Sequence, residues 1–134
     1  MTTRTAPSLL VLVVEDDPSI AEVLVIVFEL LGHRCFTAAS GAAGLAAASA
    51  HGPDVAFIDL GLPDMSGFDV AFRLRADRSD APLYVVAMTG SSPTTDSSHS
   101  IAAAFDEYLV KPVEPETLAK TVARARDRRS VPAS

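Results

Sequence analysis

The sequence contains no tryptophan and one cysteine, Cys35, and only 6% of its residues are aromatic. One cysteine excludes an internal disulfide framework and is typical of a protein in a reducing compartment. No apolar run reaches the roughly 18 residues that indicate a membrane span. The first residues, MTTRTAPS, lack the apolar stretch of a secretory signal. These absences predict a cytoplasmic protein without a membrane partner.

Positive charge is also scarce. The 11 Lys and Arg residues stand against 17 Asp and Glu, which gives a formal net charge of −6. Because an acidic surface repels phosphates, this composition predicts no nucleic-acid partner. Apolar residues, in contrast, are abundant: 49% of the 134 residues are hydrophobic, which is enough for one domain with a substantial core.

Short apolar runs alternate with helical spacing along the chain. The run Leu9–Val14 is entirely apolar, as a strand covered on both faces would be. Asp17 can cap the helix that follows, with Pro18 at its first position and Gly32 at its end. The residues of this helix expected to face the core are Ile20, Val23, Leu24, Val27, Phe28 and Leu31.

The same alternation continues to the end of the chain. Further strands are expected at Arg34–Ala38, Val55–Ile58, Leu83–Met88 and Tyr108–Val110, and further helices at Ser40–Ala50, Phe68–Arg75 and Glu114–Arg129. One more helix is expected to begin late or fray between Gly90 and Ser100, where helix propensity is low. The pattern predicts an α/β fold, a five-stranded parallel sheet with five helices on both faces, over residues 9–129. Residues 1–8 and 130–134 are expected to be tails.

The polar residues at the strand ends form a chemically coherent set. Glu15 and Asp16 follow the first strand, Asp59 the third, and Thr89 and Lys111 the last two. Carboxylates that converge in one crevice repel one another unless a cation lies among them, and few protein oxygens around a hard divalent ion are typical of Mg²⁺. Lys111 and Thr89 would help to neutralise a transferring phosphoryl group. Asp59 would be the nucleophile, forming an acyl phosphate.

Each of these residues alone has a simpler interpretation. Asp16 could be a solvated loop residue or a helix cap, Thr89 a turn residue and Lys111 a surface charge. The hypothesis of phosphoryl transfer depends on all of the strand ends carrying the required residue type together.

The segments VLVVEDDP, FIDLGLPDMSG, VVAMTG and EYLVKPV resemble the signature segments of response regulator receiver domains of two-component systems. The resemblance covers about residues 8–128. It implies a flavodoxin-like fold with strand order 2-1-3-4-5. It also implies Mg²⁺-dependent phosphoryl transfer from the phosphohistidine of a histidine kinase or histidine phosphotransfer protein to Asp59.

The resemblance further assigns roles to single positions. Asp16 and Asp59 would bind the metal directly, Glu15 directly or through water, and Gly61 through its backbone carbonyl. Thr89 would bind a phosphoryl oxygen and Lys111 would pair with the acyl phosphate. The peptide bond from Lys111 to Pro112 would be cis. Tyr108 would be the switch aromatic that turns inward when Thr89 moves toward the phosphoryl group.

The first helix also carries apolar residues outside its expected core face. Ala21, Val25 and Ile26 are the residues that we expect to contact a partner bearing the phosphohistidine, because receivers commonly dock their partners on this helix. Scattered surface hydrophobics or a homodimer contact are the alternatives.

Three other functions remain to be compared. A phosphohydrolase of the haloacid-dehalogenase type would need a second Asp where Gly61 stands, and a flavodoxin-like cofactor binder would need a phosphate-binding loop where EDDP stands. A degenerate receiver that only binds proteins is the third. We expect no enzyme with an external substrate, only self-phosphorylation and slow hydrolysis. No output segment is recognised, so a stand-alone receiver and a receiver from a hybrid kinase are both consistent with the sequence.

Overall fold

The computed structural model of the chain describes residues 8–77, 83–90 and 104–130. Its strands are β1 (Leu10–Val14), β2 (Arg34–Ala38), β3 (Val55–Asp59), β4 (Tyr84–Thr89) and β5 (Glu107–Val110), and its helices are α1 (Pro18–Leu30), α2 (Gly41–His51), α3 (Gly67–Asp77) and α5 (Pro115–Ser130). All strand pairs are parallel and the order is β2-β1-β3-β4-β5, which confirms the predicted fold class and strand order. The helix expected between Gly90 and Ser100 lies outside the described residues.

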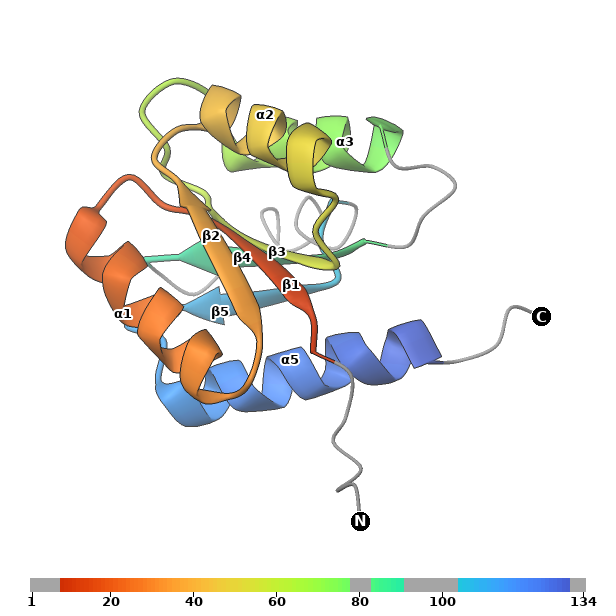
Figure 1. The fold of residues 1–134 in the computed structure, drawn as a ribbon. Coiled ribbons are helices and arrows are strands. Elements are labelled where there is room, and N and C mark those ends of the chain that lie inside the picture. Colours follow the sequence, from red (N-terminus) through yellow and green to blue (C-terminus); the bar gives the residue numbers. More distant parts are fainter. Residues whose placement is uncertain (1–7, 78–82, 91–103, 131–134) are drawn as a thin grey trace, which may run out of the picture.

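Two helical layers cover the sheet. Figure 1 shows α2 and α3 on one face and α1 and α5 on the other. Successive β1 residues serve the two layers alternately: Leu12 and Val14 belong to the core beneath α2 and α3, and Val11 and Val13 to the core beneath α1 and α5. This alternation explains why the strand is apolar at every position, because each side chain meets a covered face.

Helix α1 begins and ends where the sequence predicts. The Asp17 carboxylate accepts the N–H of Ser19 at 2.9 Å, and Gly32 adopts a φ of 92° after the last turn. Its core face agrees with the expectation only in part: Leu24 and Phe28 are buried and Val27 packs against the core. The buried residues are Ala21, Leu24 and Phe28, whereas Ile20, Val23 and Leu31 are 36%, 55% and 41% exposed. Because α1 is apolar on most of its surface, the pattern alone did not fix which side faces the sheet.

This apolar surface is not that of a transmembrane helix. Among the described segments, no helix combines the length and the apolar character needed to cross a bilayer.

Candidate functional site

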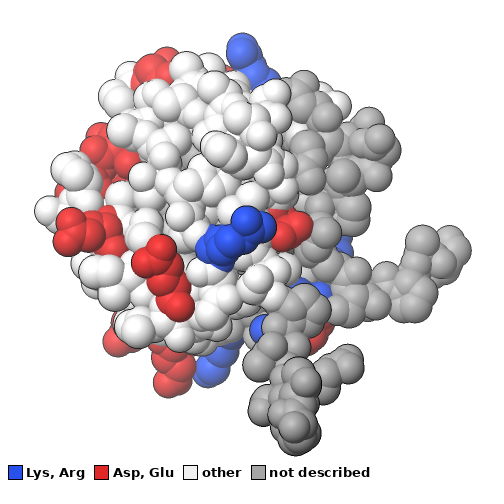
Figure 2. All heavy atoms as spheres, viewed as in Figure 1, with Lys and Arg blue, Asp and Glu red and all other residues white. Residues whose placement is uncertain are grey.

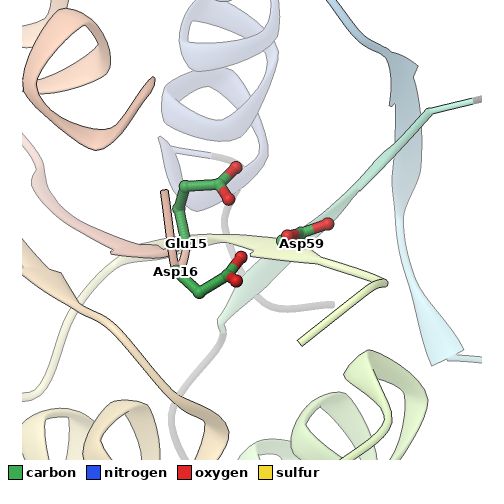
Figure 3. A group of neighbouring side chains, drawn as sticks. All are labelled: Glu15, Asp16 and Asp59. Atoms are coloured by element: carbon green, nitrogen blue, oxygen red, sulfur yellow. The ribbon is translucent and has the colours of Figure 1, made fainter. Parts of the chain in front are cut away.

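The carboxyl ends of β1 and β3 bring three carboxylates together. Glu15 and Asp16 directly follow β1, and Asp59 is the last residue of β3 (Figure 3). One carboxylate oxygen from each of the three lies within 4.8 Å of the others. Glu15 and Asp59 are buried, at 2% and 7% exposure, and Asp16 is exposed. The predicted acidic cluster therefore exists, with one carboxylate open to solvent.

Lys111, which follows β5, supplies the positive charge. Its Nζ atom lies 2.7 Å from Oε1 of Glu15 and 3.4 Å from Oδ1 of Asp59. Burial raises the pKa of Glu15, although the bond from Lys111 acts in the opposite direction. Burial would lower the pKa of Lys111, but the two carboxylates outweigh it and the pKa of this lysine is raised. Lys111 is thus held as a charged ammonium between the two buried acids.

Thr89 and Lys111 are joined through the backbone. Thr89 is the last residue of β4, and its carbonyl accepts the N–H of Lys111 at 2.7 Å. The peptide bond between Lys111 and Pro112 is cis, as the family resemblance implied. Tyr108 lies in β5 with 45% of its surface exposed.

Gly61 lies at the start of the loop between β3 and α3. Its N–H donates to Oδ1 of Asp59 at 3.0 Å, and this bond helps to fix the orientation of the carboxylate. The loop therefore contacts the candidate phosphoacceptor directly.

The donor set fits a hard divalent cation. Three carboxylates face one ammonium, so the cluster carries an excess of negative charge that a cation would balance. All of the side-chain donors are oxygens, which Mg²⁺ prefers, and the exposed position of Asp16 leaves room for the waters that Mg²⁺ retains.

The expected docking residues of α1 are not all at the surface. Ile26 is 49% exposed and Val25 is half-buried, but Ala21 is only 7% exposed and belongs to the buried face. Ala21 lies one turn before Leu24 and two turns before Phe28, near the side that packs against the sheet, but with Val25 it also lines a hollow that contains Glu15 and Asp16.

The exposed apolar surface of α1 continues into a pocket beside Lys111. A pocket of about 480 Å³ is lined by Ile20, Val23, Met88, Pro112 and Val113, among others. The charged residues within α1 are both acidic, Glu22 and Glu29. Figure 2 shows that acidic side chains gather on the side of the molecule where α1 lies, next to a broad uncharged area.

The sequence-based reasoning missed Asp64, which lies in the loop between β3 and α3. Its two carboxylate oxygens accept the N–H groups of Gly41 and Ala42, at the start of α2. No local signal could have identified these bonds, because Asp64 and the helix that it caps are far apart in the sequence.

Comparison with known proteins identifies the same kind of domain. The model of the family described as "Response regulator receiver domain" matches residues 11–123. "Transcriptional regulatory protein KdpE" of Mycobacterium tuberculosis is 42% identical over 103 residues, which are 77% of this chain and 44% of that protein. "DNA-binding response regulator MtrA" of Mycolicibacterium smegmatis is 40% identical over 120 residues, 90% of this chain and 51% of that protein. The chain thus spans about half the length of these relatives.

Solved structures agree with this result. A CheY-like response regulator receiver domain from Methylobacillus flagellatus aligns with a TM-score of 0.80 and 31% identity, over 89% of this chain and 99% of that one. Another CheY-like receiver domain, from Methanospirillum hungatei, aligns with a TM-score of 0.82 and 27% identity, over 92% and 97%.

The relatives overturn one expectation. The absence of a nucleic-acid partner was inferred from the net charge of −6, yet the MtrA relatives are named as DNA-binding response regulators. The inference failed because net charge describes only the segment in which it is counted. The relatives are about twice as long as the segment that matches, so their DNA-binding property need not reside in that segment.

Proposed function

Because the chain belongs to the response regulator receiver domain family, we propose that it accepts a phosphoryl group on Asp59 from the phosphohistidine of a partner. The observation that carries this proposal is the convergence of Glu15, Asp16 and Asp59 within 4.8 Å, with Lys111 bonded to two of them. The same arrangement of carboxylates and a lysine is what phosphoryl transfer to an aspartate requires.

The transfer step uses the residues of this chain as follows. An oxygen of Asp59 attacks the phosphorus atom, the new O–P bond forms, and the P–N bond to the donor imidazole breaks. The imidazole leaves with the bonding electron pair and takes up a proton. Lys111, which is 3.4 Å from Asp59, stabilises the negative charge on the acyl phosphate. The hydroxyl group of Thr89 donates a hydrogen bond to a phosphoryl oxygen.

Asp16, Asp59, Glu15 and the carbonyl of Gly61 would hold Mg²⁺. When bound, the ion neutralises charge on the phosphoryl oxygens and orients them for in-line attack. Glu15 and Asp59 are buried, and the exposed Asp16 forms the side of the site that is open to solvent.

Phosphorylation would switch a two-state element made of Thr89 and Tyr108. Thr89 ends β4 and Tyr108 lies on the neighbouring strand, opposite Ala87. Since Tyr108 is 45% exposed, an inward rotation of its ring would bury apolar surface once Thr89 moves toward the phosphoryl group. The domain would act as a cytoplasmic switch that catalyses its own phosphorylation and slow hydrolysis and turns over no external substrate.

The relatives suggest the class of output. Because KdpE and MtrA are named as transcriptional and DNA-binding regulators and match most of this chain, we propose that this receiver controls transcription in the same way. A segment that binds DNA would then be the part that responds to the switch.

The exposed part of α1 is proposed as the surface on which the phosphodonor docks. Val23 and Ile26 are 55% and 49% exposed, and Val23 lines the apolar pocket next to Lys111. Replacing both residues by Glu should slow transfer from a histidine kinase or histidine phosphotransfer protein at least tenfold, but not from acetyl phosphate. Phe72→Glu is the matched control, because Phe72 is 51% exposed on α3, at the opposite face of the sheet. Equal slowing with both donors would reject this docking surface.

The experiment that tests the proposed function is intact-mass measurement after incubation with acetyl phosphate, with Mg²⁺ or with chelator. We expect one added phosphoryl group that requires Mg²⁺ and is lost in Asp59→Asn. Asp69→Asn, at an exposed carboxylate in the first turn of α3, should be phosphorylated as the wild type is. A folded protein that binds Mg²⁺ and gains no phosphoryl group would favour the alternative, a degenerate receiver that only binds proteins.

A further inference from the structure

The loop between β3 and α3, residues 60–66, is held to the sheet at both of its ends. The N–H of Leu60 donates to the carbonyl of Met88 at 2.9 Å. At the other end, α3 begins at Gly67, where a Cβ would lie only 2.8 Å from the carbonyl oxygen of Asp59. A residue with a side chain would therefore push the start of α3 away from the end of β3.

The apex of the same loop is fixed to α2 by Asp64. Its Oδ1 accepts the N–H of Gly41 at 2.8 Å and its Oδ2 accepts the N–H of Ala42 at 3.0 Å. Both N–H groups belong to the first turn of α2, where no intrahelical acceptor exists. These two bonds lower the pKa of Asp64, whose side chain is exposed.

Helix α2 has a local cap in addition. The hydroxyl oxygen of Ser40 accepts the N–H of Ala43 at 3.1 Å, and the carbonyl of Ser40 accepts the N–H of Gly44 at 2.9 Å. The start of the helix is thus capped from two sources, one local and one in the loop after β3. The bonds from Asp64 differ from the local cap in that they join two separate segments.

A second contact joins the same two segments. A Cβ at Gly41 would lie 2.3 Å from Cγ of Met65, so the Met65 side chain occupies the space that any larger residue would need. Adjacent loop residues, Asp64 and Met65, therefore both attach to the first turn of α2.

We propose that Asp64 is a positioning residue for the phosphoryl-transfer site, and this inference rests on the function proposed above. Gly61 lies in the first half of the loop, and its N–H orients the Asp59 carboxylate through the 3.0 Å bond to Oδ1. The Gly61 carbonyl is the backbone ligand assigned to Mg²⁺. Because Gly61 and Asp64 lie three residues apart in a short loop, the bonds from Asp64 to α2 restrict the path of the backbone at Gly61. Without the bonds from Asp64, Gly61 would be held less firmly at the Asp59 carboxylate and at the position where its carbonyl would bind Mg²⁺.

The test compares Asp64→Ala, Asp64→Asn and the control Ser40→Ala. Ser40→Ala also removes a cap of α2, but it leaves the loop attached. Mg²⁺ affinity is measured by titration calorimetry, and hydrogen exchange of the Gly61 amide is measured in the metal-free protein. We expect Asp64→Ala to weaken Mg²⁺ binding about tenfold, as loss of a group that orients a metal ligand typically does. The Gly61 amide should exchange faster in the same variant. Asp64→Asn keeps one carbonyl acceptor, so its Mg²⁺ affinity and its exchange rate at Gly61 should lie between those of the wild type and of Asp64→Ala.

Ser40→Ala should bind Mg²⁺ as tightly as the wild type and should not change exchange at Gly61. The proposal would be overturned if Asp64→Ala kept the affinity and the exchange rate of the wild type, or if Ser40→Ala weakened binding to the same extent. A wild type that does not bind Mg²⁺ would instead contradict the proposed function, and the exchange rate at Gly61 would still report whether Asp64 holds the loop.

Discussion

Lys111 is bonded more closely to the buried Glu15, at 2.7 Å, than to the candidate phosphoacceptor, at 3.4 Å. The lysine therefore supports the charge of Glu15 as well as serving Asp59. Removing it leaves a buried carboxylate without this counter-charge, a situation that is costly when burial is deep.

We predict that Lys111→Met lowers the free energy of unfolding by about 2 kcal/mol at neutral pH, less than for a fully buried pair because the lysine side chain is 21% exposed. Since burial raises the pKa of Glu15, this carboxyl becomes neutral on mild acidification and the deficit should shrink as the pH falls. Urea unfolding at several pH values measures both effects. Lys120→Met is the control, because the Lys120 side chain is 68% exposed. A loss of unfolding free energy in Lys111→Met that grows toward acid pH would contradict the pairing of Lys111 with Glu15.

Asp16 provides a prediction about the metal. Replacing it by Asn removes one of three neighbouring negative charges, so the metal-free protein should become more stable by about 1 kcal/mol. Mg²⁺ should raise the melting temperature of the wild type, because a ligand that binds only the folded state stabilises it, and this increase should be lost in Asp16→Asn. Glu22→Gln, at an exposed position of α1, should respond to Mg²⁺ as the wild type does.

His33 predicts a pH dependence of stability at mildly acid pH. Its Nδ1 accepts the N–H of Leu9 at 2.9 Å, and burial, together with the charge of Arg126, lowers its pKa in the folded state. The unfolded chain therefore binds the proton first. The stability contributed by neutral His33 should be complete above a pH of about 6.5 and should decline as the pH falls toward the folded-state pKa.

Denaturant unfolding of His33→Asn measures this contribution, because the amide oxygen can accept the Leu9 bond and does not titrate. The stability of the variant should change less than that of the wild type between neutral and mildly acid pH. If the free energy of unfolding changed with pH equally in the two proteins, His33 would not be responsible for the pH dependence.

Asp106 is expected to dominate the loss of stability in stronger acid. Burial would raise its pKa, but the N–H of Val85 at 2.8 Å and the guanidinium groups of Arg75 and Arg128, each at 3.0 Å, lower it. Its contribution should be present above a pH of about 4 and be lost as the pH falls further. Asp106→Asn should cost about 2 kcal/mol at neutral pH, and its stability should approach that of the wild type in acid. Acid-dependent urea titrations of both proteins test this prediction.

Gly44 tests the packing of α2 against the sheet. Intrinsic helix propensity favours Ala over Gly by about 1 kcal/mol. However, a Cβ at Gly44 would lie 2.8 Å from Cγ2 of Val14, inside the core. We therefore predict that Gly44→Ala destabilises the protein by about 1–2 kcal/mol. The losses from Gly44→Ala and Val14→Ala should add up to more than the loss in the double variant, and a stabilised Gly44→Ala variant would show that α2 can shift outward.

Much of the fold could be predicted because polar residues mark the ends of the apolar runs. Entirely apolar segments such as Leu9–Val14 are typical of covered strands, and Asp59 and Thr89 stand where strands end. The carboxyl ends of parallel strands meet at one edge, so the cluster of Glu15, Asp16 and Asp59 followed from the strand assignment alone.

The rest depends on contacts between distant segments. The side of α1 that faces the sheet could not be read from a helix that is apolar nearly all round, and this is why Ile20, Val23 and Leu31 were expected in the core. The bonds from Asp64 to α2, and from Asp106 to α3 and α5, join residues with no regular spacing in the sequence. Such bonds become visible only once the elements have been packed together.

The residues of the site come from distant positions in the sequence, and this has a consequence for the newly made chain. Glu15, Asp16 and Asp59 have all been synthesised once β3 is complete, but Lys111 is added later, after all five strands. A nascent chain that stops before β5 would hold an acidic cluster without its ammonium group. Because chains are made from the N-terminus at about 5–20 residues per second, this imbalance lasts for seconds on the ribosome. The order of the strands thus makes the charge balance of this cluster depend on a residue that is added only after the last strand.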